Sequence, residues 1–558
     1  MPPSSSTSSY QLPDLLSLAR KIELRTNRHC RNVTLASERW FLEELQEKEV
    51  QEGNDESGLG LASLVFRFQR DPRRGLGPGE GAGSNKTQPP TDLTIPQMKI
   101  GLLAALCFPT CDLSQLRLAV DFWTVVWCEN EWILKGAWGE DGPLDIVEVV
   151  RGWWWSLSSK ETEGESEEKT DVFTVLKTHT HFKHLLPQLA RLSSTMSPRW
   201  NKQFALGVFG LRDAQIEAAR YRMSVSTPKS DSTSTSNPES LTIPISSDTP
   251  TLTPSQGLNP TPLLQPTSKT VLEPTLLTDQ TYIPIRRNLS GLPIIFCFVE
   301  ALEGLELDDL YLNATADSNT TAATSDGTSA PAKGKAKASD DGQDAKDLER
   351  MRELVGDVIA LAWDIYSYNI DQSLSSNPFN IVHVLLAQKQ RLRLRPSPSQ
   401  SRLKGTGTGL GAGLGGVNAA IHQAGIIVKE KFEEYERIER GLAGRCGLGP
   451  DDSVSGSGSA SPNGTSTGSG LLKNWLWKPR PTSPLPLSSS LSGNSTTPSN
   501  SRYSNGTQTD LSLFLLGLKD CLVGSLNWAY ETEMFFGNKG DSVRGYGWVF
   551  LLGRREGV

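Results

Sequence analysis

The sequence lacks the segments that would direct the chain out of the cell or across a membrane. Its first residues are Met-Pro-Pro-Ser-Ser-Ser, without the basic start and apolar core of a secretory signal. No apolar run approaches the roughly 18 residues that a membrane-spanning helix needs. The seven cysteines are odd in number and scattered, which favours buried free thiols over disulfides. These absences predict a cytoplasmic protein with no membrane span.

An excess of positive charge is also lacking. The formal net charge is −7 and the isoelectric point is about 5.6, so the chain does not have the basic surface of a nucleic-acid-binding protein. The one basic run, residues 389–395, is short and enters a Pro/Ser/Gly-rich tract, and we interpret it as a solvated helix end. Nucleic acid is therefore not an expected partner. The sequence leaves a monomer and a homodimer equally open.

Apolar residues are scarce for a chain of 558 residues. Only 37% are hydrophobic, while 50 glycines and 34 prolines gather in tracts that are also rich in Ser and Thr. Such tracts cannot bury enough apolar surface to offset the conformational entropy lost on folding. They are residues 50–93, 224–275, 313–346, 397–416 and 447–508. We therefore predict a single domain, residues 10–555, interrupted by disordered inserts at these five places.

The remaining segments have the hydrophobic pattern of helices, and few alternating runs suggest strands. The predicted helical segments are residues 98–134, 199–222, 346–374, 378–396, 417–442 and 510–536. The first should break at Pro109 and resume after Asp112, a favourable N-cap. Its second half is apolar nearly all round, as expected of a helix in the centre of a protein. The pattern predicts an all-α fold around buried central helices.

Three clusters could carry chemistry. An apolar helix ends in the acidic group at residues 129–131, where carboxylates could hold a hard cation above an apolar pocket, although a solvated helix end explains the cluster as well. Ser367 and Asp371 are four residues apart and offer oxygen ligands on one helix face, although this spacing is also common in ordinary helices. Arg286 and Arg287 precede a predicted helix break at Gly291, and an arginine facing a cavity suits a phosphate group.

Taken in order, short motifs of this chain resemble those of the fungal class I terpene synthases, the sesquiterpene synthases in particular. They are residues 12–16, 27–29, 36–40, 101–106, 121–131, 282–291, 363–372, 379–382 and 510–537. The resemblance covers nearly all of the segments predicted to be ordered. It implies the class I terpenoid synthase helical bundle, and its weight comes from the order and spacing of the motifs more than from any one of them.

The resemblance also implies an activity. Enzymes of this family bind Mg²⁺, with Mn²⁺ as an alternative, and ionise a prenyl diphosphate, usually farnesyl diphosphate. The allylic cation then cyclises in an aromatic pocket, where π faces stabilise positive charge. Carried over residue by residue, the implied metal ligands are Asn130, Glu131, Ser367 and Asp371. The implied catalytic residues are Arg287, as the diphosphate sensor, and Gly291, at the helix break, and the implied pocket residues are Phe108, Phe122, Trp127 and Trp363.

The chain departs from the family at several of these positions. Asn130 stands where the family has its leading aspartate, and Leu134 replaces the trailing one. Trp363 replaces an asparagine ligand, Ile370 a basic residue, and residues 534–535 (Met-Phe) an Arg-Tyr pair that contacts diphosphate. Two hypotheses therefore stand: a terpene synthase that works through an irregular metal site, or a catalytically inactive protein of this fold that binds a prenyl ligand or a protein partner.

Overall fold

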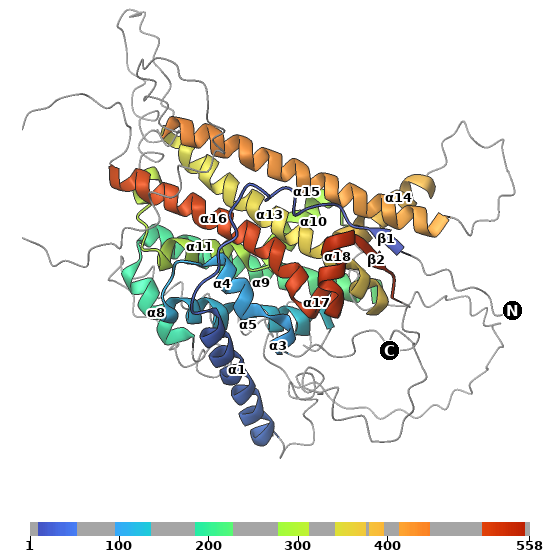
Figure 1. The fold of residues 1–558 in the computed structure, drawn as a ribbon, viewed down its shortest axis with the longest axis horizontal. Coiled ribbons are helices and arrows are strands. Elements are labelled where there is room, and N and C mark those ends of the chain that lie inside the picture. The colour runs from blue at the N-terminus through green and yellow to red at the C-terminus, as the bar shows by residue number, and fades with distance from the viewer. Residues whose placement is uncertain are drawn as a thin grey trace, which may run out of the picture.

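The structure is a computed structural model that describes residues 9–52, 95–135, 185–226, 277–311, 341–374, 379–394, 412–446 and 505–552. Helices dominate these residues, as the sequence predicts (Figure 1). The helices of the first half are α1 (Cys30–Glu52), α3 (Ile95–Met98), α4 (Ile100–Cys107), α5 (Leu113–Lys135), α8 (Leu186–Thr195) and α9 (Pro198–Ser226). The later elements are α10 (Asp279–Leu289), α11 (Leu292–Leu302), α13 (Asp341–Leu374), α14 (Ile381–Leu394), α15 (Ala412–Arg445), α16 (Asn505–Glu531), α17 (Glu533–Phe536), a 3₁₀ turn η5 (Gly537–Lys539) and α18 (Gly540–Tyr546).

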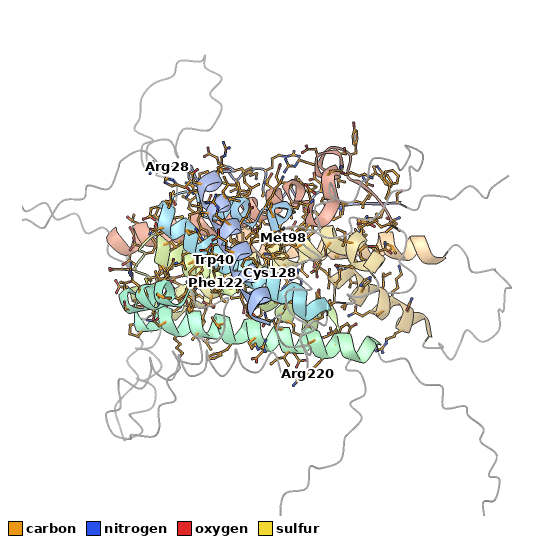
Figure 2. The ribbon with its side chains drawn as sticks, turned by 90° about the horizontal axis from the view of Figure 1, so that it is seen from below. Arg28, Trp40, Met98, Phe122, Cys128 and Arg220 are labelled. Carbon is orange, nitrogen blue, oxygen red and sulfur yellow. The ribbon has the colours of Figure 1, made fainter. Side chains whose placement is uncertain are left out.

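The long helix α13 lies at the centre of the bundle. Figure 1 shows α13 and α15 running side by side, with α16 along another side of α13. Residues 358–366 of α13 are all buried, around the full circumference of the helix. Residues 118–126 of α5 are buried in the same way, and Figure 2 places Phe122 and Cys128 of this helix within the helical body, whereas Arg220 of α9 lies at the outer edge. The predicted central helices are therefore confirmed.

The predicted break between α4 and α5 is confirmed, together with its N-cap. The carboxylate of Asp112 accepts a hydrogen bond from the Gln115 amide, and the Gln115 side chain accepts one from the Asp112 amide, each at 2.8 Å. This reciprocal pair satisfies backbone donors at the start of α5. Asn27, from the N-terminal segment, donates to the carbonyl oxygens of Phe108 and Cys111, also at 2.8 Å. The connection between α4 and α5 is therefore held both by the cap at the start of α5 and by hydrogen bonds from the N-terminal segment.

The predicted break at Gly291 is likewise confirmed, since α10 ends at Leu289 and α11 begins at Leu292. Gly291 has φ 73°, in the left-handed region that favours glycine. A Cβ atom at this position would lie 3.0 Å from a methyl group of Val126 on α5. Glycine is therefore required here both by the backbone conformation and by the close approach of α5.

Helix boundaries differ from the sequence predictions at several places. Helix α13 begins at Asp341, inside the predicted insert 313–346, and its first turns contain Ala, Lys, Leu and Glu, which favour helix. Helix α15 begins at Ala412, inside the predicted insert 397–416, although Gly413, Gly415 and Gly416 in its first turns disfavour helix. Helices α1, α9 and α16 also extend a few residues into the predicted inserts 50–93, 224–275 and 447–508. The other residues of the five predicted inserts lie outside the described part of the chain, so their disorder stays a prediction.

Two features were not predicted. The predicted helix 510–536 is interrupted at Thr532, whose hydroxyl accepts a hydrogen bond from the Met534 amide and starts α17. The strands β1 (Ser9–Gln11) and β2 (Trp548–Phe550) pair antiparallel, so that the first and last described segments of the chain lie together. The prediction of a single domain over residues 10–555 stays a prediction. All seven cysteines are free thiols, as predicted. Among the described helices, none combines the length and the apolar character needed to cross a membrane.

Candidate active site

Three tryptophans from three helices meet beside the middle of α13. The ring of Trp363 on α13 lies 5.2 Å from Trp127 on α5 and 5.6 Å from Trp528 on α16, measured between ring centroids, and Trp127 lies 5.7 Å from Trp528. We refer to Trp127, Trp363 and Trp528 as the tryptophan cluster. Phe535 of α17 packs edge-on against Trp528 at 5.6 Å and extends it. The cluster gives the centre of the bundle an apolar, aromatic surface.

Two oxygen-bearing side chains follow Trp363 on the same face of α13. The Ser367 hydroxyl donates to the Asp371 carboxylate at 2.7 Å, and Asn380, just before α14, donates to the same carboxylate at 2.9 Å. Both Ser367 and Asp371 are half-buried. We refer to these two residues as the oxygen pair. The sequence prediction that they share a helix face is confirmed, and Asn380 is a supporting residue that the spacing alone did not indicate.

The oxygen pair is compatible with Mg²⁺ to a limited extent. A hydroxyl and a carboxylate are hard oxygen ligands, and Mg²⁺ in proteins is often held by one or two carboxylates with water and phosphate oxygens completing its shell. The described residues contain no cluster of three or more Asp, Glu, His or Cys side chains suited to a metal ion. The donor set thus fits a cation that shares its coordination with a phosphate ligand, and does not form a complete metal site of its own.

The paired arginines of α10 are both bound to carboxylates of α13. Arg286 donates to Asp364 at 2.6 Å. Arg287 donates to Asp357 at 2.7 Å and lies 3.1 Å from Glu353. Asp357 is fully buried and also pairs with Lys431 of α15 at 3.1 Å. Arg287, the predicted diphosphate sensor, therefore faces α13 but is engaged by acidic side chains of the protein.

A buried tyrosine completes the contact between α10 and α13. The hydroxyl of Tyr282 donates to the carboxylate of Asp364, which also accepts from the backbone amide of Ile381. Burial, together with the nearby Asp364 charge, raises the pKa of Tyr282 well above its ordinary value, so it remains a donor. Asp364 thus holds α10, α13 and the start of α14 together. In the sequence, this role of Asp364 was indicated only by its position next to Trp363 within the motif at residues 363–372.

The acidic end of α5 contacts the helix break. Asn130 donates to the Leu289 carbonyl at 2.6 Å and accepts from Gln215 of α9 at 3.0 Å, so its amide is used at both ends. Glu129 is buried, and burial raises its pKa to about 7 although Arg212 and Gln215 favour the charged form. The side chain of Glu131 lies outside the described residues. The assignment of Asn130 and Glu131 as metal ligands stays a prediction.

The four predicted pocket residues do not all come together. Trp127 and Trp363 are in contact within the tryptophan cluster. Phe122 packs edge-on against Phe298 of α11 at 5.1 Å, and Phe108 is paired with Trp123 at 6.5 Å. The structure therefore brings together one pair of the four, and it adds Trp528, which the sequence showed only as part of the C-terminal motif.

Comparison with known proteins gives a short sequence match and several distant likenesses in structure. No protein-family model matches the chain. A sesquiterpene synthase, Agr1 of Cyclocybe aegerita, is 44% identical over 47 residues, which are 8% of this chain and 14% of that protein. The chain therefore spans only a small part of the curated relative that it matches.

Solved structures that are similar to this one include an α-eudesmol synthase and a germacradien-4-ol synthase. The α-eudesmol synthase is 11% identical to this chain, with a TM-score of 0.42, and the alignment covers 91% of this chain and 96% of the synthase. The germacradien-4-ol synthase from Streptomyces citricolor is 10% identical, with a TM-score of 0.42, and the alignment covers 94% of this chain and 98% of that synthase. At TM-scores below 0.5 these likenesses carry no argument by themselves. The ordered motifs, the helical fold and the 47-residue match together confirm that this chain resembles the terpene synthase family.

Proposed function

We propose that this chain is a terpene synthase that ionises a prenyl diphosphate, farnesyl diphosphate foremost, and cyclises the resulting cation. The observation that carries the proposal is the face of α13, where the oxygen pair lies one and two turns beyond the tryptophan cluster. One end of this face suits a cation and a diphosphate, and the other suits a hydrocarbon chain. The 47-residue match to a sesquiterpene synthase supports the choice of substrate class.

The residues of the chain would have distinct tasks in this reaction. Ser367 and Asp371 would hold Mg²⁺, or Mn²⁺ in its place, and the bound ion would stabilise negative charge on the departing diphosphate. Arg287 would offer its planar fork to the diphosphate after exchanging a carboxylate partner on α13. The rings of the tryptophan cluster would exclude water and stabilise positive charge on the hydrocarbon. Gly291 would keep α10 and α11 broken, so that Arg287 ends one helix beside α13.

A second candidate function is binding of a prenyl ligand, or of a protein partner, without ionisation. It is favoured by Trp363, whose fully buried ring fills the position where the family has a metal-ligating asparagine. Arg287 also has carboxylate partners already, and freeing it would leave the buried Asp357 with Lys431 alone. Each lost ligand could cost about 2–4 kcal/mol of transition-state stabilisation, by analogy with a removed oxyanion donor. A slow enzyme and an inactive binding protein would therefore have the same residues at the metal and diphosphate positions, and only a measurement of activity separates them.

The test is incubation of the purified full-length chain with farnesyl diphosphate, with and without Mg²⁺, followed by analysis of extracted hydrocarbons and terpene alcohols. A product that requires Mg²⁺ supports the terpene synthase. Binding of the substrate without any product, with geranyl and geranylgeranyl diphosphate equally inert, would replace it with the second candidate. Variants that separate these outcomes at single residues are given in the Discussion.

A further inference from the structure

Two members of the tryptophan cluster have buried donors with no acceptor. The indole N–H groups of Trp127 and Trp363 are inaccessible to solvent, and neither has a hydrogen-bond partner in the described part of the protein. Their rings are in contact, with centroids 5.2 Å apart and planes inclined by 54°. A buried donor without a partner costs free energy, and most buried polar groups in proteins are paired. Two such donors on touching rings indicate a place where a ligand supplies the acceptor.

The third member of the cluster provides an internal contrast. The N–H of Trp528 donates to the backbone carbonyl of Lys99 at 2.9 Å, so its hydrogen bond is made within the protein. Trp123 also has a buried, unpartnered N–H, but its ring contact is with Phe108 and, among the described residues, it has no ring pair with the cluster. The unmet donors of the cluster are therefore confined to Trp127 and Trp363, on the side where α5 faces α13.

The surroundings of these two donors favour an uncharged acceptor. The cluster is built from aromatic rings, and transferring a charged group into such surroundings without a counter-ion is very costly. The nearest basic residues on α10 are engaged, Arg286 by Asp364 and Arg287 by Asp357. A hydroxyl oxygen needs no counter-ion and has two lone pairs, one for each N–H. A diphosphate is better placed at the oxygen pair, farther along α13.

We propose that Trp127 and Trp363 form a binding site for the hydroxyl group of an isoprenoid alcohol, held by their two indole N–H groups. This inference rests on the proposed function for the presence of an isoprenoid chain at the cluster, and it adds the chemical class of that ligand: an oxygenated terpenoid and not a pure hydrocarbon. In this site Trp363 has exchanged a metal ligand for a neutral hydrogen-bond donor.

The experiment compares two probes of equal chain length, farnesol and farnesene, which differ in the hydroxyl group. Dissociation constants are measured by isothermal titration with the full-length protein. Because farnesene is the less soluble in water, the hydrophobic effect alone would favour it. We expect farnesol to bind about tenfold more tightly, the size of effect that a satisfied pair of buried donors gives.

Variants assign the preference to particular N–H groups. Trp363→Phe and Trp127→Phe each keep an aromatic ring and remove one donor, and each should reduce the preference for farnesol to about threefold or less. Trp528→Phe is the matched control, because it changes a ring of the same cluster whose N–H is already bonded, and it should keep the tenfold preference. Circular dichroism verifies that each variant is folded. Because there are two donor variants, the test can still be made if one of them does not fold.

The outcomes separate this inference from the proposed function. Equal affinity for the two probes in the wild-type protein would overturn the alcohol site, as would an unchanged preference in both donor variants. Mg²⁺-dependent turnover of farnesyl diphosphate would stand regardless of that result. Conversely, a farnesol preference that depends on Trp363, in a protein with no turnover, would support the alcohol site and remove the terpene synthase.

Discussion

At the residue scale, the side chain of Arg287, which was predicted to bind diphosphate, forms ion pairs that hold two helices together. Its guanidinium bridges Asp357 and Glu353 on α13, and Asp357 is fully buried. The sequence placed Arg287 one turn before the helix break, which the structure confirms. The carboxylates that receive it were not predictable, because they lie about seventy residues later in the chain and have no motif of their own. Only the packing of α10 against α13 brings them together.

Replacement of Arg287 by alanine should reduce stability as well as activity. Removing it leaves Asp357 with Lys431 as its one ionic partner in the described structure, and breaking a buried ion pair typically costs about 3 kcal/mol. The free energy of unfolding, from urea titration, checks this expectation. Arg287→Lys retains the charge and should recover part of the loss. An Arg287→Ala protein as stable as the wild type would show that the pair with Asp357 contributes little.

The oxygen pair can be tested with little disturbance of the fold. Asp371→Asn keeps the size of the side chain but removes the charge, and it should lower the Mg²⁺-dependent rate by about a hundredfold, as expected for a lost charge-stabilising group. Glu217→Gln on α9 is a control, since Glu217 forms only an exposed pair with Arg220. Product formation per unit time, measured at several Mg²⁺ concentrations, distinguishes the two. Equal rates for Asp371→Asn and the wild type would exclude Asp371 as a ligand.

Glu129 predicts a pH dependence of stability. Its pKa in the folded protein is raised to about 7 from 4.5, so the folded state holds the proton more tightly than the unfolded chain. Stability should therefore fall as the pH rises from about 4.5 to about 7 and then level off, by about 3 kcal/mol for this shift. Unfolding free energies at pH 5 and pH 8 measure this change, and Glu129→Gln should remove that part of it. A variant with the same pH slope as the wild type would contradict the raised pKa.

At the scale of elements, the sequence predicted breaks that depend on local chemistry and missed those that depend on distant contacts. Asp112 and Gly291 mark helix ends through an N-cap and a left-handed backbone, which are properties of the residues themselves. The end of α16 has both kinds of cause, because Thr532 caps α17 locally and is also bound by a distant segment. Thr532 is held by the carbonyl of Met98, at 2.9 Å, far away in the sequence. No pattern within residues 510–536 could have indicated that contact.

The break at Gly291 can be tested by adding a single methyl group. Gly291→Ala should destabilise the protein by about 1–2 kcal/mol, because an L-residue is strained at φ 73° and its Cβ would press on Val126. Gly304→Ala, with φ 62° and open space around it, measures the strain alone. Thermal unfolding of the two variants compares them. A Gly291→Ala loss no larger than that of Gly304→Ala would show that the contact with α5 is easily relieved.

For the whole molecule, the all-α class was predictable from the helical hydrophobic pattern, and the central place of α5 was predictable because an apolar circumference is visible in its sequence. The full burial of residues 358–366 of α13 was found only in the structure. The aromatic centre was only partly predictable. Trp363 was expected to fill a ligand position, but its contact with Trp127 and Trp528 depends on how α5, α13 and α16 approach one another. The small sheet of β1 and β2 was not predicted, since each strand is three residues long and the two strands are more than 500 residues apart in the sequence.

The central claim is that this molecule ionises a prenyl diphosphate with the oxygen pair of α13 and the tryptophan cluster side by side. The most direct measurement is release of inorganic diphosphate from farnesyl diphosphate by the purified full-length protein, followed over time with and without Mg²⁺. We expect release above the uncatalysed rate only when Mg²⁺ is present, and its loss in Ser367→Ala combined with Asp371→Asn. No release with Mg²⁺ or Mn²⁺, from a protein that still binds the substrate, would contradict the account.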